Sequence, residues 1–180
     1  MEGSSRYHAQ VSNTFNEDMT QYLKYISGSE IETKRIAARL ARGLKENDCL
    51  ALMGNFGSGK TIFVKGLAKG LGFRKKDYVC SPSFVILKIY RARLPIYHFD
   101  LYRLNREADA QAVGMLEFVG AGGIAVIEWA QKVKRLLPKE CLRIKFLVRG
   151  AKKRELHFFA PVPRLKKLVK KAIGCTYGYL

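Results

Sequence analysis

The feature that most constrains this chain is a glycine-rich run at residues 54–61, which reads Gly-Asn-Phe-Gly-Ser-Gly-Lys-Thr. A continuous apolar run at 49–53 precedes it, as expected of a strand buried on both faces, and a helical pattern over 62–71 follows. Glycines at these spacings let successive backbone N–H groups point at phosphate oxygens, at the positive end of a helix dipole. The run therefore predicts a P-loop (Walker A motif) that binds a nucleotide.

Specific roles follow for the side chains of this loop. Lys60 is expected to place a positive charge at the β- and γ-phosphates, and the Thr61 hydroxyl is expected to bind Mg²⁺. ATP and Mg²⁺ are thus the predicted cofactors. The residues expected to contact the nucleotide are Asn55, Phe56, Gly57, Ser58, Gly59, Lys60, Thr61 and Ile62.

Two acids downstream are candidates for the metal-associated carboxylate that such a site needs. Asp100 closes the apolar run 96–99, and Glu128 closes the run 124–127. Ligands of open α/β sheets bind beyond the carboxyl ends of strands, so both acids are expected near the metal or the attacking water. The alternative is a surface acid at the end of a strand.

Two further residues near these acids are open to more than one interpretation. Trp129, the only tryptophan, either belongs to the core or closes over the nucleotide. His98 is interpreted as a packed strand residue, because no second His or Cys accompanies it at metal-ligand spacing.

The remaining pattern predicts one α/β domain, a P-loop NTPase with a mixed parallel and antiparallel central sheet flanked by helices. Ser29 and Glu32 form a capping-box pattern before a helix at 30–44. Strands are expected at 84–90 and 96–99, joined as an antiparallel hairpin, and at 141–148 and 155–159 as a second pair. We expect a flexible tail over 1–20, the ATPase domain over 21–160 and a basic C-terminal helix or tail over 161–180.

Composition argues against several other classes of protein. The four cysteines (Cys49, Cys80, Cys141 and Cys175) show no CxxC pair, which favours free thiols over a disulfide framework or a zinc site. No apolar stretch approaches the roughly 20 residues of a membrane span, and no hydrophobic signal core follows Met1. We therefore expect a soluble, cytoplasmic protein without a membrane partner.

The net charge of +18 is concentrated near the C-terminus. From residue 131 to 180 there are 15 Lys or Arg against Glu140 and Glu155 alone, so 13 of the 18 charges lie in the last 50 residues. Such a run is often only a solvated face. An excess this uneven nevertheless favours a polyanionic partner, and RNA is the foremost candidate.

Several motifs beyond the loop together resemble one known family. They are Ser-Pro-Ser-Phe at 81–84, Tyr-His-Phe-Asp-Leu-Tyr-Arg-Leu at 97–104 and Ile-Glu-Trp at 127–129, in order after the P-loop. This series resembles the TsaE family, the bacterial ATPase required for threonylcarbamoyl modification of the adenosine next to the anticodon of tRNA. The resemblance runs from about Ser27 to about Phe159.

The resemblance implies an ATPase that works with TsaD and TsaB, and whose ATP turnover resets that pair between catalytic cycles. It implies that Thr61, Asp100 and Glu128 surround the metal, that Asp100, Glu128 and Trp129 serve hydrolysis, and that 81–83 is a switch-like segment. The chain departs from the family pattern at Ser83 in place of Thr, Ile62 in place of Thr and Asn55 in place of Asp. The basic C-terminal region, a candidate tRNA contact, is not expected of every member.

Two other functions remain open on the sequence. One is a different P-loop enzyme, such as a small-molecule or nucleotide kinase, which would need an acceptor pocket and usually a lid of arginines. The other is an RNA-binding module that holds nucleotide only as a structural ligand. A kinase needs an added acceptor, an ATPase of this family hydrolyses slowly without its partners, and the module does not hydrolyse.

Overall fold

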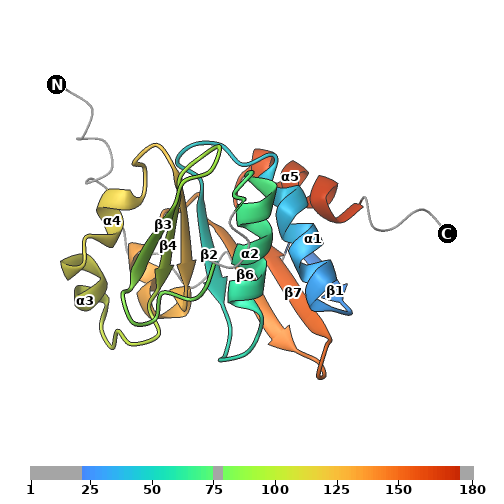
Figure 1. Cartoon of the computed structure of the whole chain (residues 1–180), viewed down its shortest axis with the longest axis horizontal. Helices are drawn as coiled ribbons and strands as arrows, with labels where there is room; N and C mark the ends of the chain where they lie inside the picture. Colours follow the sequence, from blue (N-terminus) through green and yellow to red (C-terminus); the bar gives the residue numbers. More distant parts are fainter. Residues whose placement is uncertain (1–21, 75–78, 175–180) are drawn as a thin grey trace.

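The computed structural model describes residues 22–74 and 79–174, so the predicted tail at 1–20 and Cys175 lie outside the described residues. The described part folds into one sheet with helices on both faces (Figure 1). In chain order the elements are β1 (Leu23–Ser27), α1 (Glu30–Ala41), β2 (Cys49–Met53), α2 (Lys60–Gly70), β3 (Leu87–Tyr90), β4 (Ile96–Asp100), α3 (Glu107–Ala112), α4 (Met115–Phe118), β5 (Ile124–Glu128), the 3₁₀ segment η2 (Ala130–Leu136), β6 (Leu142–Val148), β7 (Arg154–Phe159) and α5 (Pro163–Gly174).

The sheet has seven strands in the order β1-β7-β6-β2-β5-β4-β3. The four central strands β6, β2, β5 and β4 run parallel to one another. The outer strands are antiparallel to their neighbours, with β7 against β6, β1 against β7 and β3 against β4. This confirms the predicted mixed sheet and places the carboxyl ends of β2, β4 and β5 at one edge.

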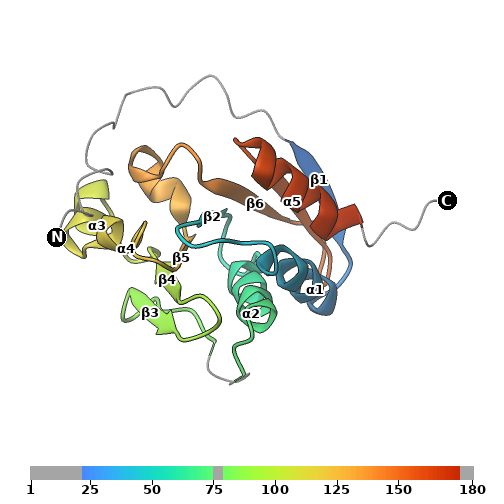
Figure 2. The same ribbon diagram turned by 90° about the horizontal axis from the view of Figure 1, so that it is seen from above.

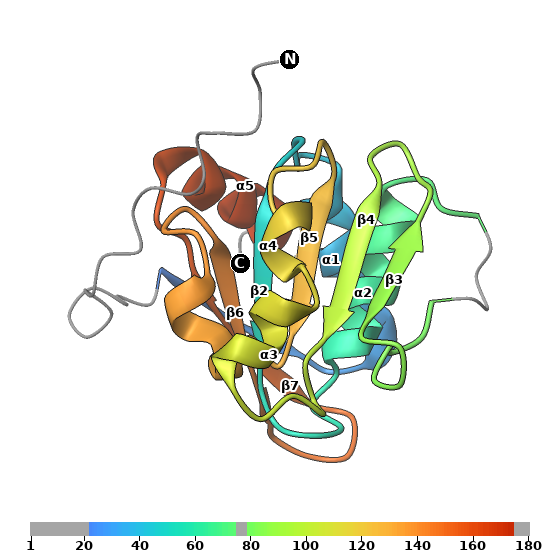
Figure 3. The same ribbon diagram turned by 90° about the vertical axis from the view of Figure 1, so that its left-hand side faces the viewer.

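Side chains of the buried strands alternate between two apolar cores. Leu50 and Leu52 of β2 pack with α1, α2 and α5, whereas Ala51 and Met53 pack with α3, α4 and η2. Figure 2 shows α1, α2 and α5 along one side of the sheet, and Figure 3 looks onto the opposite side, where α3 and α4 lie. Every residue of β2 and β5 is buried, which explains their continuous apolar runs.

The start of α1 agrees with the capping signal in the sequence. The Ser29 side chain accepts a hydrogen bond from the Glu32 backbone N–H at 3.1 Å, and the Glu32 carboxylate accepts one from the Gly28 N–H at 2.6 Å. The helix ends at Ala41 rather than at residue 44, and Leu44 is buried in the turn that follows.

Two other predictions of local structure need correction, and one strand was not predicted. The helix predicted at 62–71 begins at Lys60, and the strand predicted from residue 84 begins only at Leu87. Phe84 and Val85 lie instead in an exposed turn in which Val85 N–H donates to the Pro82 carbonyl. Strand β1 was missed, because its buried positions Tyr25 and Ser27 and its outward Ile26 give no apolar alternation.

Among the described residues the cysteines Cys49, Cys80 and Cys141 are free. Cys49 and Cys141 are buried at the starts of two neighbouring parallel strands, and their sulfur atoms lie 3.0 Å apart. In the part of the chain that the structure describes, no helix has the length and apolar character needed to cross a membrane.

Candidate functional site

The candidate site lies at the sheet edge where the parallel strands β2, β4 and β5 end. The P-loop leaves β2 after Met53, and Asp100 and Glu128 end β4 and β5 as direct partners in the register. Both carboxylates are buried, with Asp100 3% and Glu128 2% exposed. The topology thus brings the two predicted acids together beside the loop, as the strand-end argument expects.

The backbone of the P-loop needs glycine at the positions that the motif supplies. Gly54 and Gly59 have φ angles of 149° and 100°, a region that residues with a side chain rarely adopt. A Cβ atom on Gly54 would lie 2.8 Å from both the Phe146 carbonyl oxygen and Ser58 Oγ. Because α2 begins directly after Gly59, its free N-terminal N–H groups belong to the same loop.

Lys60 holds its ammonium group inside the loop. Nζ donates to the carbonyl oxygens of Gly54 and Asn55, each at 2.9 Å, and it lies 4.2 Å from the centre of the Trp129 ring. Burial lowers the pKa of Lys60, while the charges of Glu128 and Asp100 act in the opposite direction. A cation held this way is ready to exchange its carbonyl partners for phosphate oxygens.

Thr61, the next residue, contacts the acid at the end of β5. Its hydroxyl donates to Glu128, with Oγ1 2.9 Å from Oε1 and 3.1 Å from Oε2. The Oε1 atom of Glu128 also accepts from His98 Nε2 at 2.9 Å. The predicted metal ligand Thr61 and the predicted acid Glu128 are therefore in direct contact, and His98 fixes the carboxylate from the interior.

The hydrogen-bond network continues from His98 into β3. Nδ1 of His98 lies 3.4 Å from the Tyr90 hydroxyl oxygen, and the Tyr90 hydroxyl donates to the Cys80 carbonyl at 3.1 Å. Burial raises the pKa of Tyr90 to about 12, so the phenol keeps its proton. Glu128 is thus supported by a chain of buried polar groups.

Asp100 faces a different set of groups from Glu128. Its carboxylate accepts hydrogen bonds from the Ser81 hydroxyl and, at 2.9 Å, from the Tyr102 backbone N–H. Ser81 begins the 81–83 segment, in which its hydroxyl lies 3.2 Å from the Ser83 hydroxyl. Asp100 therefore connects the end of β4 with the segment predicted to be switch-like.

An aromatic group covers the mouth of the loop. Trp129 and Tyr102 have ring centres 5.0 Å apart, and Tyr102 lies 6.2 Å from Phe56, which is 82% exposed. Trp129 has a φ of 60°, which is unusual for a bulky residue, and this turn directs the chain away from β5 directly after Glu128. Trp129 is only partly buried, and it belongs both to the core edge and to the surroundings of Lys60.

The donor set fits a nucleotide phosphate group with Mg²⁺. The loop offers backbone N–H groups and one lysine, and the adjoining edge offers the Thr61 hydroxyl and two carboxylates, the oxygen donors that Mg²⁺ prefers. In the described part of the chain there is no cluster of three or more His, Cys, Asp or Glu side chains that could hold a metal alone. Mg²⁺ commonly completes its coordination with substrate phosphates and water.

Two residues near this site were not predicted to take part in it. His98 was interpreted only as a packed residue, although Ile96, His98 and Asp100 alternate on one face of β4 and so point toward α2. That alternation is the signal that could have revealed it. Arg154 of β7 donates through Nη2 to the Gly57 carbonyl at 3.3 Å, and no local sequence pattern indicates this contact.

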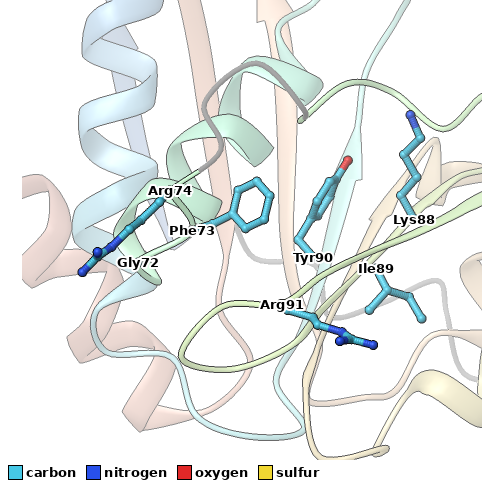
Figure 4. A pocket seen from close by; sticks show the side chains of 7 residues that line it. All are labelled: Gly72, Phe73, Arg74, Lys88, Ile89, Tyr90 and Arg91. Atoms are coloured by element: carbon cyan, nitrogen blue, oxygen red, sulfur yellow. The ribbon is translucent and has the colours of Figure 1, made fainter.

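A separate cavity of about 630 Å³ lies beyond the far end of α2 (Figure 4). Tyr90 is in its wall and pairs with Ile96 at the start of β4, so the cavity is at the opposite end of the strand from Asp100. Figure 4 shows the Phe73 and Tyr90 rings next to one another, and they pack edge to face with ring centres 5.3 Å apart. The cavity is lined by Gly72, Phe73, Arg74, Lys88, Ile89, Tyr90 and Arg91.

Comparison with protein families identifies one match that covers most of the chain. Residues 27–156 match the model of the family described as "Threonylcarbamoyl adenosine biosynthesis protein TsaE". The match includes the loop, both acids and Trp129, and it ends before α5.

Individual relatives agree with this match. The chain is 38% identical to the tRNA threonylcarbamoyladenosine biosynthesis protein TsaE of Bacillus subtilis (83% of this chain and 92% of the relative), and 37% identical to that of Treponema pallidum (74% and 98%). Among solved structures, the crystal structure of Bacillus subtilis YdiB superposes with a TM-score of 0.72 at 35% identity, covering 86% of this chain and 96% of YdiB.

Proposed function

The chain belongs to the TsaE family of tRNA threonylcarbamoyladenosine biosynthesis, and from that premise we propose that it is a Mg²⁺-dependent ATPase acting with TsaD and TsaB. One observation carries the proposal above the others. The hydroxyl of Thr61, the residue that follows the loop lysine, donates to the buried carboxylate of Glu128. A hydroxyl and an acid paired at the first turn of α2 are what a Mg²⁺-nucleotide site requires.

Each residue of the edge has a distinct role in this proposal. Lys60 neutralises the β- and γ-phosphates, and the backbone N–H groups of the loop bind their oxygens. Mg²⁺, when bound, offsets the charge that develops on the phosphates during hydrolysis. Thr61 and Glu128 hold the metal side of the site, and Asp100 orients water or metal beside the 81–83 segment.

The buried position of these groups supports hydrolysis over simple binding. Charges act more strongly where water is excluded, and Lys60, Asp100 and Glu128 are all less than 5% exposed. The Trp129 ring, whose centre lies 4.2 Å from Lys60 Nζ, shields the ammonium group from water on that side. A site of this kind can accelerate phosphoryl transfer without a covalent intermediate.

The partners TsaD and TsaB enter through the family relationship. An exposed aromatic surface next to the P-loop offers a contact for them, because Phe56 and Phe84 are 82% and 81% exposed beside the site. We propose that ATP turnover in this chain resets the TsaD–TsaB pair between rounds of tRNA modification. That work belongs in the cytoplasm, where ATP and tRNA are both present.

The test is ATP hydrolysis by the purified chain, alone and with the TsaD–TsaB pair from the same organism. We expect slow release of phosphate from ATP and Mg²⁺ without any acceptor, and a faster rate when the pair is added. Lys60→Ala in the same mixture is the control for contaminating ATPases. An absolute need for a small-molecule acceptor would instead indicate a kinase, and binding without any hydrolysis would indicate a nucleotide-dependent RNA-binding module.

A further inference from the structure

The outer face of helix α5 is lined with positively charged side chains. Its inner side chains are buried against the core, whereas its outer face carries five exposed cations and no acid. The buried residues are Leu165, Val169, Ala172 and Ile173, and the exposed cations are Arg164, Lys166, Lys167, Lys170 and Lys171. The helix is thus fixed on its apolar side, and its cations are held in a defined array.

Within the described residues, two of these cations make a contact that explains their presence. Arg164 pairs with Asp48, with Nη1 3.2 Å from Oδ2, and Lys166 lies over the Tyr22 ring at 5.7 Å from its centre. In the described residues, Lys167, Lys170 and Lys171 form no ion pair with an acid. Three neighbouring lysines repel one another, so a bound polyanion would lower the free energy of the face.

The positive surface extends from α5 to the end of α1. The two helices lie side by side (Figure 2), and a Cβ atom on Gly43 would be only 2.3 Å from Leu168 Cδ1. Leu168 shares one ridge of α5 with Arg164 and Lys171, at spacings of four and three residues. The residues beside Gly43 add the exposed cations Arg42 and Lys45 to this surface, and also the exposed acid Glu46.

This face lies outside the residues that the family model matches. The family match ends at residue 156, and α5 begins at Pro163. Helix α5 supplies none of the residues assigned to the nucleotide site, so a role in ATP binding does not account for its charges.

The composition of the face favours nucleic acid over a protein partner. Contact surfaces between proteins are depleted in lysine at their centres and enriched in aromatic residues and Met. Large apolar side chains that are exposed in the described residues lie elsewhere, and none of them is on α5. Lysines without an apolar anchor suit a phosphate backbone, where affinity comes from charge neutralisation and counterion release.

We propose that the outer face of α5, with the adjoining end of α1, binds the phosphate backbone of tRNA. The tRNA is the polyanion that the pathway of this family modifies. The three lysines without an acidic partner each neutralise a phosphate, and the rigid seat of α5 on the core fixes their spacing. This contact positions the RNA and reads no base.

The experiment is a salt titration of tRNA binding by filter retention. The probe is an unmodified transcript of a tRNA with adenosine next to its anticodon. The test variant is Lys167→Gln, Lys170→Gln and Lys171→Gln combined, which leaves Arg164 and Lys166 with their contacts. The matched control removes three exposed cations near η2, with Lys134→Gln, Arg135→Gln and Lys139→Gln combined.

The wild-type affinity should fall steeply with salt, and the α5 variant should lower the slope of log affinity against log salt by about 2 to 3. The α5 variant should also bind about tenfold or more weakly at low salt, while the control variant stays close to wild type. Circular dichroism of both variants checks that the fold is intact. Three outcomes would each overturn the proposal: no tRNA binding by the wild type, equal loss in both variants, or an unchanged slope accompanied by slower association with TsaD–TsaB.

Discussion

The P-loop edge and the outer face of α5 each carry lysine side chains that an anion could bind, but they hold those lysines in opposite ways. At the P-loop edge a single lysine is 4% exposed and donates to two carbonyl oxygens of its own loop. On α5 five cations are exposed, and three of them form no ion pair with an acid in the described residues. One region fixes one charge at one place, whereas the other spreads many charges over a surface.

The difference indicates what each region can recognise. A buried charge is weakly screened by salt and must be matched by a ligand of defined shape, such as the phosphates of a nucleotide. Exposed lysines interact through a longer and screened field, and each contributes little alone. We therefore expect single substitutions to be decisive at the edge and only combined ones to matter on α5.

The largest expected effect is that of Lys60→Ala on ATP binding. The variant removes the only lysine side chain within the loop, so the affinity for Mg²⁺-ATP should fall at least about a hundredfold, or about 2.8 kcal/mol. Isothermal titration calorimetry measures this directly. Lys69→Ala is the matched control, because Lys69 is exposed at the other end of α2. This variant should bind ATP like the wild type. Equal affinities for Lys60→Ala and wild type would remove the nucleotide site from this edge.

The next effect separates binding from hydrolysis at the same edge. Asp100→Asn and Glu128→Ala should each slow ATP hydrolysis by about a hundredfold, while ATP affinity changes far less, because the acids act on metal and water rather than on the phosphates. Phosphate release measures the rate of hydrolysis, and calorimetry on the same samples measures the affinity for ATP. Glu140→Ala, at an exposed acid away from the edge, is the control. Hydrolysis at the parent rate in both variants would show that neither acid has its proposed role.

A smaller effect is expected at His98, which contacts Glu128 rather than the nucleotide. His98→Asn shortens the side chain that fixes the carboxylate, so kcat should fall about tenfold while the dissociation constant for ATP stays nearly constant. His157→Asn is a matched histidine control, since His157 pairs with Glu155 on the distant strand β7. A parallel loss of kcat and ATP affinity in His98→Asn would indicate damage to the fold instead of lost positioning.

These three predictions rest on parts of the site that the sequence reveals to different degrees. The loop and its setting between a strand and a helix could be predicted, because the glycines and the flanking patterns are local, although the helix begins at Lys60 rather than at Ile62. That Asp100 and Glu128 lie close together could be anticipated, because each ends a strand. The side chains that hydrogen-bond to them could not be anticipated. Thr61 and Ser81 reach these acids from 67 and 19 residues away, and only the order of strands in the sheet determines such contacts.

Two regions with weak or misleading local patterns show more clearly how far the sequence alone can predict the fold. Strand β1 pairs with β7, more than 120 residues later in the chain, and its outward Ile26 hides the alternation that marks a strand. The apolar run at Phe84 and Val85 resembles a strand, yet it forms an exposed turn because the chain folds back on the Pro82 carbonyl. In both cases tertiary contacts override the local pattern.

The smallest expected effect concerns an acid that lies among cations. Glu155 accepts from Arg149 Nε at 2.7 Å and from His157 Nε2 at 2.5 Å, and these bonds hold its pKa at about 2, below the ordinary 4.5. Its stabilising contribution is therefore complete above pH 4.5 and is lost as the pH falls toward 2. Urea unfolding at several pH values should show that Glu155→Gln reduces the slope of stability over this interval.

The control for this prediction is Glu30→Gln, at a largely exposed acid whose only ion pair in the described residues is with Lys34 at 3.8 Å. In this variant, stability should fall with decreasing pH as steeply as in the wild type. If Glu155→Gln and Glu30→Gln have the same slope, the contacts around Glu155 do not couple its proton to folding. The argument that a closely paired charge has a large individual effect would then hold only for the P-loop edge.

The most direct test of the central proposal is the number of threonylcarbamoyladenosine residues formed on tRNA by each TsaD–TsaB pair. With a supplied threonylcarbamoyl donor, ATP and this protein, we predict many rounds of modification per pair. With Lys60→Ala in its place, we predict about one round, because the pair is not reset. Many rounds with Lys60→Ala, at the rate seen with the wild type, would contradict the proposal that ATP turnover at the P-loop edge drives the cycle.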